Sequence, residues 1–177
     1  EEIIGRMEKA AAAGKTVARL HTGDPSLYGA LQEQLAELRA RRIEYEIIPG
    51  VSSFLAAAAA LEREYTLPEV AQTVILTRVA GKTPVPANED LEKLAEHNTS
   101  LAVFLSVQLI DKVITGLKEG YSPAAPAAVV YKASWPEEKI ITGRLDNIAG
   151  RVEEAGIDRT ALILVGEFLT GDGAYSQ

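Results

Sequence analysis

Apolar residues recur at intervals of three and four positions along much of the chain, which is the spacing of one helix face. Between residues 26 and 42, for example, Leu27, Leu31, Leu35 and Leu38 follow this spacing. A second predicted helix is the alanine-rich stretch that runs to about Arg63, which Ser52 or Ser53 can cap at its start. The spacing predicts helices over residues 2–13, 26–42, 53 to about 63, 89–96, 110–119 and 147–155.

Short runs of strand-forming residues, bounded by glycine, proline or aspartate, alternate with these helices. They predict seven strands, at Val17–Leu20, Tyr45–Ile48, Thr73–Thr77, Leu101–Leu105, Ala127–Tyr131, Lys139–Thr142 and Ala161–Val165. The alternation of strand and helix indicates an α/β fold. We expect residues 1–66 to be the remainder of an N-terminal α/β domain that lacks its first strand, and residues 67–177 to form a C-terminal α/β domain. Residues 82–88, with two prolines, are expected to form a loop of the kind that crosses a pocket.

The composition restricts the function classes. Of the 177 residues 47% are hydrophobic and 24% are charged, which is enough apolar material for a folded core. Cysteine is absent, which excludes a disulfide scaffold and thiolate chemistry and favours a reducing, cytoplasmic location. A net charge of −7 without a run of Lys or Arg argues against nucleic-acid binding. The longest apolar stretch, Val51–Leu61, is too short to span a bilayer, so no membrane anchor is expected. The start at Glu1 rather than Met indicates a fragment.

The first candidate site is the loop Thr22–Gly29, which lies between a predicted strand and a predicted helix. Open α/β sheets bind ligands at this position. Gly23 permits close approach of the backbone, and Asp24 offers acceptors for hydroxyl or ammonium groups. The alternative is that Asp24 and Pro25 only cap the helix that follows.

A second loop, Pro49–Ser53, repeats this arrangement at the end of the next predicted strand. Two neighbouring loops at one sheet edge predict a single cleft, although Ser52 and Ser53 taken alone are more often helix caps than ligand contacts. The glycine-rich fingerprints of dinucleotide enzymes and of P-loop hydrolases are absent. The two histidines, His21 and His97, have no carboxylate cluster at metal-ligand spacing, so no metal site is expected. No serine lies in a nucleophile elbow, and the residues favour a reaction that needs no protein nucleophile.

Six strings of the chain, taken together and in order, resemble the tetrapyrrole methylases. GDPxxYG and the PGVSS turn are typical of the whole family, whereas TLPEVAQTVILTR, the TPVP loop and ASWPEE favour the branch that methylates C11. The strings are HTGDPSLYGAL (21–31), EIIPGVSSFLAAAAAL (46–61), YTLPEVAQTVILTR (65–78), SLAVFLSV (100–107), VVYKASWPEEKIITG (129–143) and RTALILVG (159–166).

The resemblance implies a homodimeric enzyme of two α/β domains that holds S-adenosylmethionine, and after reaction S-adenosylhomocysteine, in the cleft between the domains. The implied substrate is precorrin-4 or cobalt-precorrin-4, methylated at C11 in cobalamin biosynthesis. One alternative is another tetrapyrrole methylase, which acts at C17 or C20 of a precorrin or on uroporphyrinogen. The other is an inactive binding fragment. The family also begins with a Gly-x-Gly-Pro-Gly loop, which is not present in this sequence.

The resemblance also implies site residues. Leu105 stands where many relatives have Met, in Phe104-Leu105-Ser106 instead of Tyr-Met-Gly, and Ala133 matches a small residue against which the cofactor lies. The implied cofactor contacts are Thr22, Gly23, Asp24, Leu27, Ser52, Ser53, Leu105 and Ala133. Because the substrate carries many carboxylates, we expect basic side chains around the proline loop and the ASWP stretch to contact it. These are Arg78, Lys82 and Lys132. No catalytic base is predicted.

Overall fold

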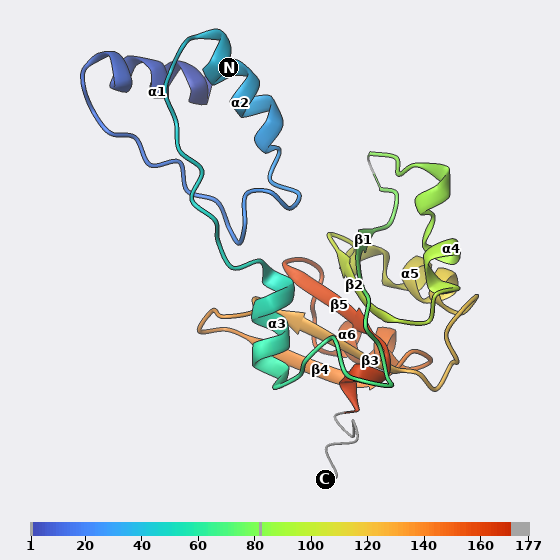
Figure 1. Cartoon of the computed structure of the whole chain (residues 1–177). Helices are drawn as coiled ribbons and strands as arrows, with labels where there is room; N and C mark the ends of the chain where they lie inside the picture. Colours follow the sequence, from blue (N-terminus) through green and yellow to red (C-terminus); the bar gives the residue numbers. More distant parts are fainter. Residues whose placement is uncertain (1, 82, 171–177) are drawn as a thin grey trace. The chain divides into compact units, whose positions relative to one another are not determined.

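The computed structural model describes residues 2–81 and 83–170. The chain divides into two compact units, Glu1–Ser53 (unit 1) and Phe54–Gln177 (unit 2), which are described separately (Figure 1). The domain division expected at residues 66–67 stays a prediction. None of the helices in the described ranges is long and apolar enough to cross a membrane.

Two helices, α1 (Glu2–Ala12) and α2 (Leu31–Ala40), form the ordered part of unit 1. They pack through a small apolar cluster in which Ile4, Leu35 and Leu38 are buried. Outside this cluster, the Arg41 guanidinium pairs with Glu8 at 2.8 Å and with Glu37 at 3.1 Å. The cluster is small, so the tertiary contacts within unit 1 are few.

The strands predicted at Val17–Leu20 and Tyr45–Ile48 are wrong: both segments are extended, but neither pairs with a neighbour in the described part of the chain. A strand is defined by its ladder of hydrogen bonds, and local sequence preference does not supply the partner. The apolar side chains of these segments are left in solvent, with Leu20 80% and Ile48 67% exposed.

Helix α2 begins at Leu31, five residues later than predicted. Tyr28 and Ala30 both adopt left-handed backbone conformations, with φ of 57° and 48°, and this interrupts the right-handed helix. The carbonyl of Pro25 lies so close to Gly29 that an added Cβ would be 2.2 Å from it. A compact turn therefore replaces the first part of the predicted helix.

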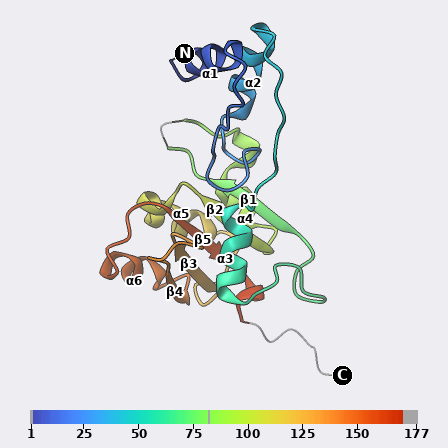
Figure 2. The same ribbon diagram turned by 90° about the vertical axis from the view of Figure 1, so that its left-hand side faces the viewer.

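Unit 2 is built on a five-stranded sheet with the order β1-β2-β5-β3-β4 (Figure 2). β1 and β2 are parallel, whereas the β2–β5, β5–β3 and β3–β4 pairs are antiparallel. The last five predicted strands are confirmed to within two residues at their ends. The observed bounds are β1 (Val74–Arg78), β2 (Ser100–Phe104), β3 (Pro126–Tyr131), β4 (Lys139–Arg144) and β5 (Ala161–Val165).

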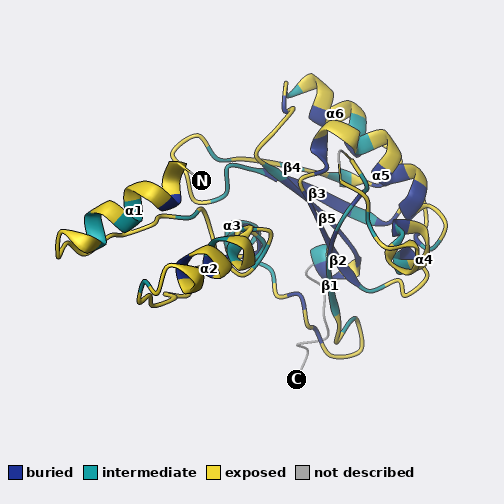
Figure 3. Cartoon of the chain, turned by 90° about the horizontal axis from the view of Figure 1, so that it is seen from above, coloured by how far each residue is buried: buried dark blue, intermediate teal, exposed yellow. Residues whose placement is uncertain are grey.

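Helices cover both faces of this sheet. α4, α5 and α6 lie on one face, and α3 lies on the other (Figure 3). The predicted helices are confirmed with somewhat shorter bounds, and three short 3₁₀ turns accompany them. The bounds are α3 (Ser53–Leu61), α4 (Leu91–Ala95), α5 (Ile110–Leu117) and α6 (Ile148–Glu154), with turns at Ala87–Glu89, Val107–Leu109 and Glu167–Leu169.

Strand β2 runs through the middle of the core, and every one of its residues is buried. Leu101 and Val103 pack with Val113 and Leu117 of α5, and all four side chains are fully buried. Burying a Val or Leu side chain contributes about 1.5–3 kcal/mol relative to exposing it. Strand β2 is therefore anchored in the core along its whole length.

Candidate functional site

The Asp24 carboxylate connects the two loops that the sequence singled out in unit 1. Its Oδ1 accepts a hydrogen bond from the Ser26 N–H at 2.8 Å, and its Oδ2 accepts one from the Gly50 N–H at 2.9 Å. These N–H groups, that of Gly50 above all, hold the pKa of Asp24 below its ordinary value, so the side chain is ionised at neutral pH. We call residues 22–29 and 49–53 the joined loops.

Glycine makes this contact between the loops possible. A Cβ added to Gly50 would lie 2.3 Å from the carbonyl oxygen of Gly23, which is closer than real Cβ contacts come. Gly23 itself has a φ of 70°, in the left-handed region that favours glycine, and its ideal Cβ position is 3.4 Å from the Ser52 Cα. The joined loops therefore meet backbone to backbone.

Asp24 is not a helix cap, since α2 starts at Leu31 and its N-cap position is Ala30. The carboxylate instead closes a turn at Ser26 and reaches the second loop. A carboxylate has about four acceptor positions, and these two hydrogen bonds use one on each oxygen, which leaves acceptor capacity for a ligand.

The other predicted contacts in unit 1 have different environments. Thr22 is exposed, Leu27 is half-buried and Ser52 is buried. Ser53 is exposed and is the first residue of α3. The roles of the six unit 1 residues as cofactor contacts stay predictions.

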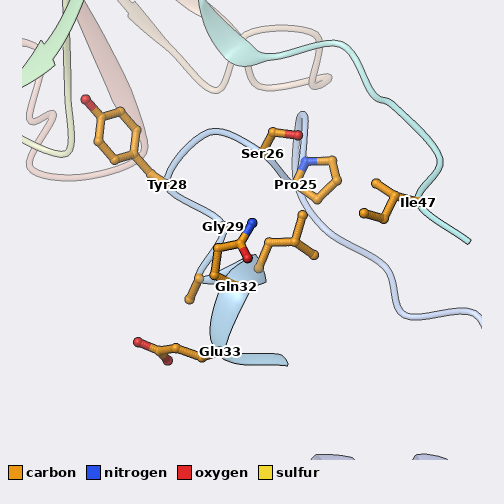
Figure 4. A pocket seen from close by; sticks show the side chains of 9 residues that line it. Pro25, Ser26, Tyr28, Gly29, Gln32, Glu33 and Ile47 are labelled. Atoms are coloured by element: carbon orange, nitrogen blue, oxygen red, sulfur yellow. The ribbon is translucent and has the colours of Figure 1, made fainter. Parts of the chain in front are cut away.

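A pocket of about 420 Å³ lies beside the first of the joined loops (Figure 4). Its lining comes from this loop, from the start of α2 and from the neighbouring extended segment. Sequence reasoning missed Tyr28, Gln32 and Ile47 as pocket residues. The left-handed turn at Tyr28, which no simple sequence signal marks, lies in the pocket wall just before the helix begins. The pocket is lined by Pro25, Ser26, Tyr28, Gly29, Ala30, Leu31, Gln32, Glu33 and Ile47.

Two predicted contacts lie on loops of unit 2. Leu105 directly follows β2, has a φ of 53° and leaves its side chain 74% exposed. Ala133 lies after β3 between two further left-handed residues, Lys132 and Ser134. The Ser134 N–H donates to a carboxylate oxygen of Glu138 at 2.6 Å, which holds this turn.

Arg78, one of the basic candidates, is engaged with the proline loop. Its guanidinium donates to the carbonyls of Thr83 at 3.1 Å and Pro84 at 2.8 Å. Arg78 therefore holds the loop and also leaves a positive charge beside it.

Lys132 lies against aromatic side chains. Its Nζ is 5.4 Å from the ring centre of Tyr131 and 5.3 Å from that of Trp135, within the range of cation–π attraction. It also lies 3.8 Å from a carboxylate oxygen of Glu137. Lys82 lies outside the described residues. Within residues 2–81 and 83–170, no three His, Asp or Glu side chains gather as metal ligands would.

Comparison with known proteins gives consistent matches over nearly the whole chain. The family described as Tetrapyrrole (Corrin/Porphyrin) Methylases matches residues 1–149. A cobalt-precorrin-4 C(11)-methyltransferase of Methanocaldococcus jannaschii is 57% identical over 170 residues, which are 96% of this chain and 66% of that protein. A precorrin-4 C(11)-methyltransferase of Mycobacterium tuberculosis is 52% identical over 175 residues, 98% of this chain and 70% of that protein. The chain thus spans about two thirds of the length of these relatives.

Solved structures agree. A cobalt precorrin-4 methyltransferase of cobalamin biosynthesis matches with a TM-score of 0.92 and 46% identity, covering 95% of this chain and 71% of the other. A uroporphyrin-III C-methyltransferase of Thermus thermophilus, solved in complex with S-adenosylhomocysteine, matches with a TM-score of 0.78 and 28% identity. That match covers 96% of this chain and 74% of the other. These likenesses confirm the predicted α/β fold class.

Proposed function

Because the chain belongs to the tetrapyrrole (corrin/porphyrin) methylases, we propose that it transfers a methyl group from S-adenosylmethionine to C11 of precorrin-4 or cobalt-precorrin-4. This reaction is a step in cobalamin biosynthesis. The observation that carries the proposal is the 57% identity with a protein named for this reaction, against 28% with a relative named for methylating uroporphyrin-III.

The joined loops fit a small cofactor with hydroxyl and ammonium groups. Backbone groups of Gly23, Ser52 and Ser53 line the place where the loops meet, so a ligand can approach the main chain closely. The ionised Asp24 keeps acceptor positions free and is already fixed by two hydrogen bonds. A preorganised acceptor loses little freedom when a ligand arrives.

When bound, S-adenosylmethionine supplies an electrophilic methyl group on a positively charged sulfur. The protein then has to align the reactants and exclude water. Charge is dispersed as the reaction proceeds, so neutral backbone groups suit the reacting atoms better than a carboxylate would. We therefore propose Asp24 as an acceptor for polar groups of the cofactor and not as a base, with Thr22, Leu27, Leu105 and Ala133 as further contacts.

For the anionic substrate we propose contacts with Arg78, Lys82 and Lys132. The chain is net negative, so local positive charge has to attract the carboxylates. Arg78 and Lys132 are each fixed by several neighbours, as described above. We further propose a homodimer that works in the cytoplasm.

The decisive experiment is incubation of the chain with ¹³C-methyl-labelled S-adenosylmethionine and, separately, precorrin-4, cobalt-precorrin-4 and uroporphyrinogen III. We expect label at C11 of a precorrin-4 substrate by NMR, and none with an Asp24→Ala variant whose helical content matches the wild type. Label at another carbon, or on uroporphyrinogen III alone, refutes the C11 assignment. Binding of S-adenosylhomocysteine without turnover of any acceptor supports a binding fragment instead.

A further inference from the structure

Ser106 is buried at the point where β2 ends, and its hydroxyl connects two strands of unit 2. The Oγ donates to the carbonyl of Phe104 at 2.6 Å and accepts a hydrogen bond from the Val79 N–H at 3.0 Å. Its side chain is 0% exposed. Val79 directly follows β1, the parallel neighbour of β2, so one hydroxyl joins the chain just after both strands.

The residue enclosed by this contact is Leu105. The hydrogen bond from Ser106 to Phe104 spans Leu105 and closes a tight turn around it. Leu105 is held with a φ of 53°, a conformation that is unfavourable for a residue with a Cβ and that glycine adopts freely. Nothing in the leucine side chain stabilises this conformation, since it is 74% exposed. The two hydrogen bonds of the neighbouring Ser106 hold the backbone at this turn.

The place of this turn is significant because ligands of open α/β sheets bind beyond the carboxyl ends of parallel strands. β1 and β2 are the parallel pair of this sheet, and the Leu105 turn lies at their carboxyl ends. A turn held by a buried hydroxyl presents the Leu105 backbone in one fixed orientation.

We infer that Ser106 is a positioning residue for the cofactor: it holds Leu105 in the left-handed turn from which Leu105 contacts S-adenosylmethionine. The inference rests on the proposed function, because it needs that cofactor. The competing explanation is purely structural, in which Ser106 only satisfies the Val79 N–H and stabilises the sheet.

Ser100 offers a matched control at the other end of the same strand. It is also a buried serine, 1% exposed, and its hydroxyl donates to the carbonyl of Tyr65 at 2.6 Å. Ser100→Ala removes a buried hydroxyl at the start of β2, and Ser106→Ala removes one just after its end. Only the second change touches the Leu105 turn.

The experiment compares these two variants and the wild-type chain by thermal unfolding and by calorimetric titration with S-adenosylhomocysteine. We expect both variants to unfold at a lower temperature than the wild type. We expect Ser106→Ala to raise the Kd for S-adenosylhomocysteine about tenfold and Ser100→Ala to leave it within about twofold. Ser106→Cys, whose thiol is larger than the hydroxyl and forms weaker hydrogen bonds, should give an intermediate Kd. It replaces Ser106→Ala in the comparison if that variant does not fold.

The outcomes are distinguishable. If Ser106→Ala, or Ser106→Cys in its place, binds as tightly as the wild type, the inference is overturned while the proposed function stands. If Ser100→Ala weakens binding as much as Ser106→Ala, the effect follows from stability and the positioning role is overturned. If the wild-type chain itself does not bind S-adenosylhomocysteine, the proposed function fails and the inference fails with it.

Discussion

The backbone contact between Gly50 and Gly23 has no room for a side chain, and Gly50→Ala tests whether the joined loops form the cofactor site. The new Cβ would start 2.3 Å from the Gly23 oxygen, whereas 3.4 Å is an ordinary contact, so the loops must separate by about 1 Å. The same displacement would lengthen the hydrogen bond from Gly50 to Asp24, now 2.9 Å, to about 3.9 Å, which is no longer a hydrogen bond.

The size of the effect follows from these displacements. Overpacking lowers the free energy of unfolding by about 1–3 kcal/mol. The lower conformational entropy of the unfolded alanine variant offsets about 0.4–1 kcal/mol of this loss. A net loss of about 1–2 kcal/mol in the free energy of unfolding of unit 1 is expected. Because both loops are displaced, we expect the Kd for S-adenosylhomocysteine to rise at least about tenfold, equivalent to about 1.4 kcal/mol.

Urea unfolding and calorimetric titration measure the two quantities, and Gly5→Ala is the matched control. Gly5 is an exposed residue of α1 in the same unit, and its added Cβ would meet nothing within 4 Å. Alanine there should stabilise the helix by about 0.5–1 kcal/mol and leave binding unchanged. Wild-type affinity in Gly50→Ala, or equal weakening in Gly5→Ala, would refute the role assigned to the joined loops.

Three further predictions concern stability. Hydrogen bonding, first from the Gly50 N–H, lowers the pKa of Asp24 in the folded chain. The ionised side chain therefore stabilises the fold fully above the unfolded pKa of 3.8, and this stabilisation is lost as pH falls through the lower folded pKa. Asp24→Asn should flatten this fall of the urea midpoint at acid pH. Burial raises the pKa of Tyr121 to about 12, so the free energy of unfolding falls as pH rises from 10 to 12. Tyr121→Phe should remove about 2 kcal/mol of that fall in alkaline denaturation. A Cβ on Gly120 would lie 2.0 Å from the last carbonyl oxygen of α4, so Gly120→Ala should lower the free energy of unfolding by about 3 kcal/mol in urea. Gly150 has open space around it, so Gly150→Ala should leave the free energy of unfolding unchanged or raise it.

Sequence patterns predicted the elements of unit 2 because each one is stabilised where its pattern lies. β5 (Ala161–Val165) has the predicted bounds, since its run of apolar residues is buried between β2 and β3. In Val17–Leu20 the same kind of run forms no strand, because a ladder depends on a partner segment and not on local preference. The mixture of parallel and antiparallel strand pairs could not be predicted either, because hydrophobic periodicity carries no information on which strands pair.

The contact between the joined loops was not predictable from the sequence, although the loops themselves were. Glycine, aspartate and serine after apolar runs marked the joined loops. The hydrogen bond from Gly50 to Asp24 joins residues 26 positions apart, and no spacing rule predicts it. No sequence pattern predicts the positioning role inferred for Ser106, because that role depends on a left-handed leucine that sequence preference disfavours.

The strand order of unit 2 also affects how the chain is made on the ribosome. β5, the latest strand in the sequence, lies between β2 and β3, so both of these strands keep an open edge until it is synthesised. Ala161 at the start of β5 lies 30 positions after Tyr131 at the end of β3, which corresponds to about 2–6 s of translation at roughly 5–20 residues per second. During that interval the nascent sheet exposes apolar strand edges, and this is the period in which a chaperone would protect it from aggregation.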